Sequence, residues 1–111
     1  MSRPVQSCRV EITEDYVTIT FCNFRSWIWN GEGHIEIRYK EAIDIRNLIQ
    51  RFLVAKFFKP KTILLHTSHC SIERRFPLAS KDECINISCP SRCFWLYYTE
   101  MLVLNDMLKT L

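Results

Sequence analysis

Six potential metal ligands lie close together in the second half of the chain. They fall between residues 66 and 93 and are His66, His69, Cys70, Cys84, Cys89 and Cys93. Zinc prefers four nitrogen or sulfur ligands in a tetrahedron, and structural sites commonly supply them as closely spaced cysteine pairs. The spacing of the last three cysteines matches this pattern only loosely, and the chain has no C-x-x-C pair. We therefore expect no cofactor. The alternative is a small zinc-stabilised domain with the ligands His69, Cys70, Cys84, Cys89 and Cys93.

The same cysteines fit a simpler interpretation, because a free cysteine often behaves as a small buried hydrophobe. A disulfide of Cys70 with Cys84 or Cys89 is disfavoured in a reducing compartment. Cys70 directly follows His69, and neighbouring side chains of an extended chain point apart, so these two do not form a nucleophile–base pair. The chain also lacks a phosphate-binding glycine motif and an H-E-x-x-H motif. We expect that this protein is not an enzyme.

Basic and aromatic residues alternate in the first third of the chain. Proteins that bind single strands stack bases on aromatic side chains and neutralise the backbone with Lys and Arg. Arg25, Trp27, Trp29 and Arg38 could form such a face. The net charge is only +3, and Glu36 lies among these residues and would repel phosphate. RNA or single-stranded nucleic-acid binding is therefore the runner-up function.

Protein–protein contact is the function that the composition favours. The chain has seven Phe, four Tyr and three Trp, and aromatic residues are enriched in the centres of interfaces. A domain of this size does not easily bury so much apolar area. The expected contact residues are Trp27, Trp29, Phe94, Tyr97, Met101, Leu104 and Leu108. The hypothesis is a non-enzymatic regulatory module and homodimer, comparable in size and composition to adaptors and viral accessory proteins.

Elements that would position these residues follow from the hydrophobic pattern. Alternating residues predict two strands around a tight turn at Glu14 and Asp15, with Val10 opposite Ile19 and Ile12 opposite Val17. A second pair of strands, over 24–29 and 34–39, is expected around the glycine-containing loop 30–33, with a bend near Asn23.

A helix over 40–58 is predicted by apolar residues at three- and four-residue intervals, and the chain breaks at Pro60. A returning strand over 62–67 is expected to join the first sheet. Helical spacing returns later and predicts a C-terminal helix over 91–110. The segment 68–90 between them, which holds most of the Cys and His residues, is expected to be irregular, apart from a short edge strand within 81–88.

The predicted fold is one α+β domain over residues 1–111. Its small antiparallel sheet consists of the N-terminal β-meander (1–39) and the returning strand, and it packs against the central helix and the C-terminal helix. The chain has no apolar run of signal-peptide length and none of the ~20 residues that a membrane span needs. We therefore expect a cytoplasmic or nuclear protein without a membrane partner.

Overall fold

The chain begins with a β-hairpin, because apolar and polar residues alternate on both sides of a two-residue turn. A computed structural model describes residues 6–25, 33–58, 63–75 and 83–111. Strand β1 (Ser7–Thr13) pairs antiparallel with β2 (Tyr16–Cys22), and Ile12 lies opposite Val17. The predicted register is confirmed.

Strand β3 (His34–Arg38) completes the first sheet, whose order is β1-β2-β3. It pairs directly with β2, so that Ile35 lies opposite Ile19. The expected bend is present at Asn23, which has a φ of 62°. Most of the strand predicted over 24–29 lies outside the described residues.

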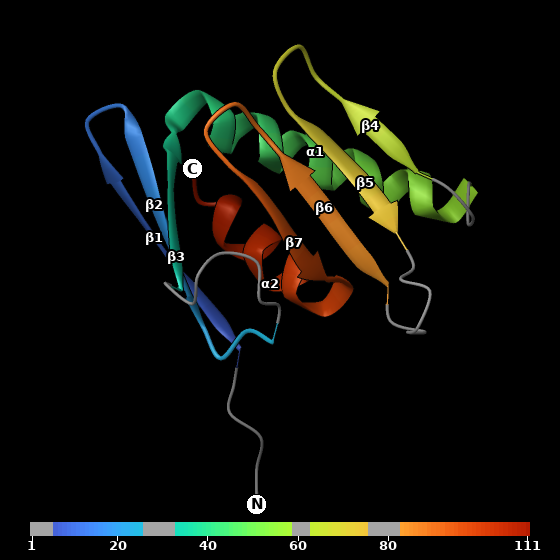
Figure 1. Ribbon diagram of the computed structural model, residues 1–111, viewed down its shortest axis with the longest axis horizontal. Coiled ribbons are helices and arrows are strands. Elements are labelled where there is room, and N and C mark those ends of the chain that lie inside the picture. The colour runs from blue at the N-terminus through green and yellow to red at the C-terminus, as the bar shows by residue number, and fades with distance from the viewer. Residues whose placement is uncertain (1–5, 26–32, 59–62, 76–82) are drawn as a thin grey trace, which may run out of the picture.

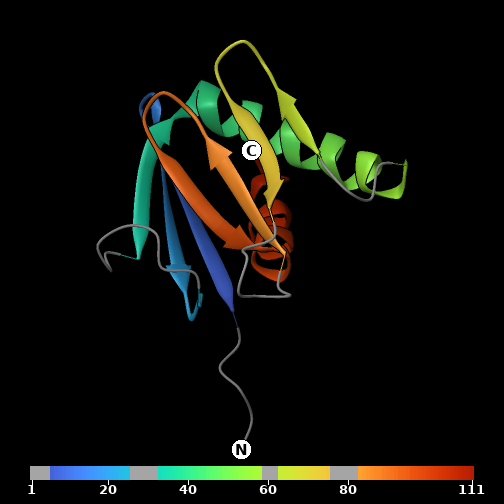
Figure 2. The same ribbon diagram turned by 45° about the vertical axis from the view of Figure 1, so that its right-hand side comes forward.

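Helix α1 (Tyr39–Phe58) confirms the predicted central helix to within one residue. Its apolar stripe is fully buried and consists of Ala42, Ile45, Leu48, Ile49 and Phe52. The helix begins directly after β3. At its other end it reaches beyond the second sheet, as Figure 1 and Figure 2 show.

Four strands form a second antiparallel sheet with the order β4-β5-β6-β7. They are β4 (Leu64–His66), β5 (Ser71–Arg75), β6 (Cys84–Ser88) and β7 (Cys93–Tyr97). Two predictions were therefore wrong. The returning strand joins this second sheet and not the first, and the segment 68–90 holds two strands, of which β6 is an inner strand and not an edge.

The predicted C-terminal helix over 91–110 is a strand followed by a shorter helix, α2 (Tyr98–Leu108). Phe94 and Leu96 are fully buried, whereas Trp95 and Tyr97 between and after them are only half-buried. This alternation is that of a strand with one face in the core. The helical prediction was wrong here because the apolar run from 94 to 98 is compatible with the 3.6-residue period of a helix and with the two-residue period of a strand.

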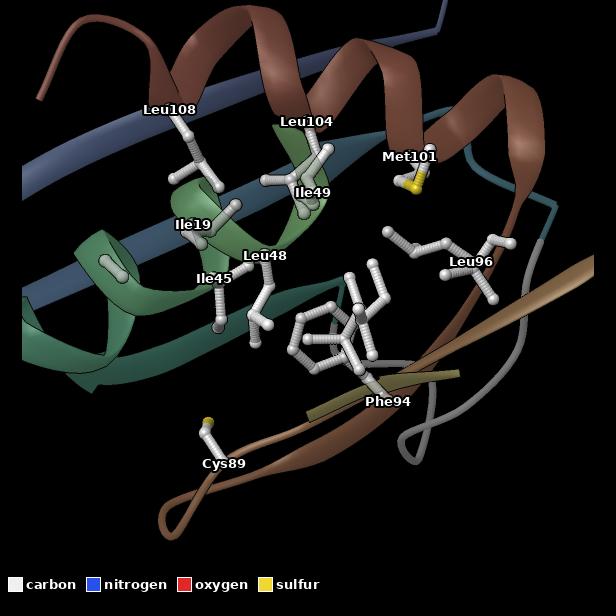
Figure 3. Packing of buried hydrophobic residues seen from close by; sticks show 14 of the residues in the cluster. Ile19, Ile45, Leu48, Ile49, Cys89, Phe94, Leu96, Met101, Leu104 and Leu108 are labelled. Carbon is white, nitrogen blue, oxygen red and sulfur yellow. The ribbon is translucent and has the colours of Figure 1, made fainter. Parts of the chain in front are cut away.

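Both helices contact both sheets and each other, so all the layers share one core. Figure 3 shows Met101, Leu104 and Leu108 of α2 pointing toward Ile49 and Ile19, which belong to α1 and the first sheet. Along the chain, an antiparallel meander followed by a helix thus occurs twice, and the fold class is α+β. None of the helices in the described ranges is long and apolar enough to cross a bilayer.

Candidate functional site

The apolar residues that were predicted to bind a partner through the last helix lie in the core. Phe94, Met101, Leu104 and Leu108 are fully buried, and Tyr97 is half-buried at the end of β7. In this structure these residues stabilise the fold and present no apolar stripe to another molecule. Trp27 and Trp29 lie outside the described residues.

The two arginines of the predicted nucleic-acid face lie at opposite ends of the first sheet. Arg38 pairs with Tyr16, the first residue of β2, whereas Arg25 lies three residues beyond Cys22, the last residue of that strand. A strand of this length spans about 20 Å. The guanidinium of Arg25 lies 4.6 Å from the centre of the Tyr97 ring, on the second sheet. The fold therefore does not bring Arg25 and Arg38 together into one basic patch.

The predicted metal ligands are also separated. His69 and Cys93 are exposed, and Cys84 lies on the opposite face of β6 from its buried neighbour Ile85. Cys70 and Cys89 are buried side by side. Within the part of the chain that the structure describes, no three His, Cys, Asp or Glu side chains are arranged to hold a metal ion.

A buried carboxylate, Glu41, connects the start of α1 to the turn between β6 and β7. It is 5% exposed. Its oxygens accept hydrogen bonds from the Arg38 N–H (2.9 Å), the Ser91 N–H (2.9 Å) and the Ser91 hydroxyl (2.6 Å). Burial alone would raise the pKa of Glu41, but these donors and the Cys89 thiol outweigh it and hold the pKa below 4.5. A carboxylate with its acceptor sites occupied in this way has a structural role and is a poor general base.

An open apolar groove lies between α1 and the edge strand β4. It has a volume of about 600 Å³ and is lined by Asn47, Gln50, Arg51, Val54, Ala55 and Leu65. Val54 is 61% exposed and Leu64, on the other face of β4, is 57% exposed. These are the two most exposed large hydrophobic side chains among the described residues. Apolar side chains are therefore exposed on both faces of the second sheet at β4.

The backbone of β4 also has a free edge. The Arg74 N–H donates to the Ile63 carbonyl, and the Thr67 N–H donates to the Cys70 carbonyl. Hydrogen bonding alternates along an antiparallel strand, so the backbone groups of Leu64 and His66 point away from β5. Among the described strands, β5 is the sole neighbour of β4. The strand thus presents two residues that can pair with another chain.

A second exposed surface lies at the corner of the first sheet that holds the β1–β2 turn and the start of α1, far from β4. Ile12, Tyr16 and Tyr39 are exposed there, and Tyr16 and Tyr39 line a shallow pocket of about 410 Å³ with Asp15, Arg38 and Lys40. The Tyr39 N–H donates to the Asp15 carbonyl at 2.7 Å, which fixes the start of α1 against the β1–β2 turn. Figure 1 shows this corner on the opposite side of the molecule from β4.

No family model, curated protein or solved structure matches this chain. The functional interpretation therefore depends on its own residues. Sequence reasoning missed the groove beside β4, although Val54 offered a signal. It continues the polar stripe of Asn47 and Arg51 on α1, so an apolar residue stands on the face that a helix normally turns to water.

Proposed function

We propose that this protein is a non-enzymatic protein–protein interaction module that associates through β4 and the groove beside it. One observation carries the proposal. The two most exposed large hydrophobic side chains are Leu64 on β4 and Val54 in the groove beside it, and the outward backbone groups of β4 have no neighbouring strand among the described residues. Strand addition at such an edge combines main-chain hydrogen bonds with pockets for alternate side chains.

A second copy of the chain is the partner that we propose first. Two β4 strands related by a two-fold axis at Leu65 would pair Leu64 of each copy with His66 of the other. The backbone groups of both residues point outward, so each pair can exchange two hydrogen bonds. Leu65 of one copy would face Leu65 of the second copy on the groove side. Such a self-complementary contact is the usual form of a dimer interface.

The reach of α1 beyond β4 supports this arrangement. A strand added next to β4 needs a partner for the side chains on its inner face, and the exposed end of α1 with Val54 and Ala55 supplies one. The interface would then extend the second sheet while covering the groove. Burial of the exposed apolar side chains would provide about 25 cal/mol for each Å² of area removed from water.

An adaptor needs a further contact surface. The corner with Ile12, Tyr16 and Tyr39 is the candidate for it, because its apolar side chains are exposed and it lies away from β4. We infer that a dimer formed through β4 would leave this corner of both copies accessible to another protein.

Light scattering over a range of protein concentrations tests the proposal. We expect the wild-type protein to reach the mass of a dimer, and Val54→Glu to raise the dissociation constant at least tenfold, which corresponds to about 1.4 kcal/mol. Ile12→Glu is the matched control, because Ile12 is 55% exposed at the far corner. It should leave the dissociation constant unchanged.

Three results would count against the proposal. They are a wild-type protein that stays monomeric at all concentrations, equal effects of Val54→Glu and Ile12→Glu, and an unchanged dimer in Val54→Glu. Binding to short RNA that weakens steeply with salt would instead favour the nucleic-acid alternative, since phosphate contacts release counterions.

A further inference from the structure

Two buried cysteines lie opposite each other at one end of two neighbouring strands of the second sheet, since Cys70 directly precedes β5 and Cys89 directly follows β6. Strands β5 and β6 pair Ser71 with Ser88, so the next step of the register places Cys70 opposite Cys89. Cys70 is 3% exposed and Cys89 is 8% exposed. The Cys89 thiol donates to the Arg92 carbonyl at 3.2 Å. Each thiol affects the pKa of the other, as expected for side chains on directly opposite positions.

The backbone around this pair has the geometry that a disulfide needs. The Cys70 carbonyl accepts its hydrogen bond from Thr67 on the side of β4, and Cys89 exchanges two hydrogen bonds with Arg92 on the side of β7. No backbone bonds therefore join Cys70 to Cys89, which makes them a non-hydrogen-bonded pair. The Cα atoms of such pairs lie about 4.5 Å apart, within the range of about 4.4–6.8 Å found for disulfides.

The other cysteines are not arranged in this way. Cys8 is buried and Cys22 is exposed, because they lie on opposite faces of the first sheet. Cys84 lies opposite Tyr97, whereas Cys93 lies opposite Ser88, four positions further along β6. Among the six cysteines of the chain, Cys70 and Cys89 are thus the pair placed for an intramolecular bond.

We propose that Cys70 and Cys89 form a reversible disulfide when the protein meets a small-molecule disulfide such as oxidised glutathione. This inference does not depend on the proposed dimer. The bond would join the β4–β5 turn to the β6–β7 turn, next to Glu41 at the start of α1. The thiol of Cys89 would then no longer donate to the Arg92 carbonyl.

The exchange is balanced in atoms and electrons. Cys89, the more exposed thiol, loses its proton and attacks oxidised glutathione, whose S–S bond breaks. The released glutathione takes up that proton, and Cys89 carries a mixed disulfide. Cys70 then attacks the Cys89 sulfur, and the second glutathione leaves with the proton of Cys70. Two protein thiols are oxidised, and one glutathione disulfide is reduced to two thiols.

Peptide mapping of the full-length protein tests this inference. The folded protein is incubated with oxidised glutathione at mildly alkaline pH, because burial raises the pKa of both thiols and the thiolate is the attacking species. Its remaining thiols are then blocked, and it is digested with trypsin without reduction. Cleavage after Lys61, Arg74, Lys81 and Arg92 gives the peptides 62–74 and 82–92. We expect them to be linked, with a mass lower than their sum by two hydrogen atoms, and to separate on reduction.

Cys84 and Cys89 share the peptide 82–92, so two variants identify the linked residue. Cys84→Ser should keep the linked peptide, and Cys89→Ser should lose it. An absent linked peptide in oxidised wild-type protein, or an equal yield in Cys89→Ser, would overturn the inference. If the serine variants fail to fold, fragmentation of the linked wild-type peptide between Cys84 and Cys89 identifies the bonded residue, and a bond at Cys84 would overturn the inference.

Discussion

Replacing Glu41 by Gln tests the role of the buried carboxylate at the start of α1. Glutamine has nearly the same shape but no charge, and its amide nitrogen replaces one of two acceptor oxygens. One oxygen of Glu41 receives the Arg38 N–H and the Ser91 hydroxyl, and the other receives the Ser91 N–H. In either orientation of the amide, at least one backbone N–H therefore faces another donor.

The expected loss of stability follows from these contacts. Hydrogen bonds to a charged group contribute about 1.5–3 kcal/mol each, and a buried donor without an acceptor costs about 1–3 kcal/mol. Allowing for the bond that Gln retains, we expect Glu41→Gln to lower the free energy of unfolding by about 3 kcal/mol near neutral pH. For a chain of this length that corresponds to a fall in Tm of about 12 °C.

The difference between the wild type and the variant should depend on pH. The pKa of Glu41 in the folded state lies below the usual value of 4.5. A lowered pKa means that the ionised carboxylate favours the folded state. Its contribution is fully present above the unfolded-state pKa and is lost as the pH falls through the folded-state pKa. Urea unfolding of both proteins from near neutral to acidic pH should therefore show a difference that shrinks below pH 4.5.

Glu36→Gln is the matched control, because Glu36 is exposed on the outer face of β3. It should change the unfolding free energy by less than about 0.5 kcal/mol. A Glu41→Gln protein as stable as the wild type, or a loss that is the same at neutral and acidic pH, would refute the role assigned to this carboxylate.

Three other predictions follow from local contacts. Glu83→Gln should lower the free energy of unfolding in urea by about 3 kcal/mol, because Glu83 pairs with the buried Arg74 at 2.6 Å and with Lys56 at 3.0 Å. Glu11→Gln is the control, because Glu11 pairs with Arg9 on the exposed surface. Equal effects of the two substitutions would contradict the role of Glu83. Glu14→Gly should raise the free energy of unfolding by about 1 kcal/mol, since Glu14 has a φ of 51° in the β1–β2 turn; a lower Tm would show that the turn is unstrained. Burial raises the pKa of Cys70 to about 11 and of Cys89 to about 12, so their alkylation in the folded protein should speed up about tenfold for each pH unit above neutrality; a rate independent of pH would contradict this.

The hairpin and the central helix could be predicted from the sequence because each has one dominant period. A shift of one residue in the β1–β2 register would place every apolar residue opposite a polar one. In the 40–58 segment, the buried stripe and the break at Pro60 agree with each other. In both segments the local pattern and the burial in the folded chain point to the same element.

Strand β5 could not be predicted because its inner face carries a charge. Ile72 is its one buried apolar residue, and the buried Arg74 pairs with Glu83, which lies nine residues later, beyond the end of β5. The alternation of apolar and polar residues does not show that an arginine will be buried against such a partner. The division into two sheets was missed for a similar reason, because alternation indicates that a strand has one buried face but does not name the neighbouring strand.

The sequence prediction of a contact surface did not locate the groove. It relied on apolar density, and the fully buried residues of the densest apolar run, Phe94 and Leu96, lie in the core. What distinguishes β4 is its position at the edge of a sheet, which depends on the pairing of all four strands. A surface of this kind becomes visible only when the tertiary arrangement is known.

Amide hydrogen exchange at Leu64 and His66, measured by NMR over a range of protein concentrations, tests the proposed association most directly. The N–H groups of both residues point away from β5, so they should exchange quickly in dilute protein and become protected as copies pair through β4. The amide of Thr67, which donates to Cys70 within the chain, should show the same protection throughout. Exchange at Leu64 and His66 that does not change with concentration would contradict the account.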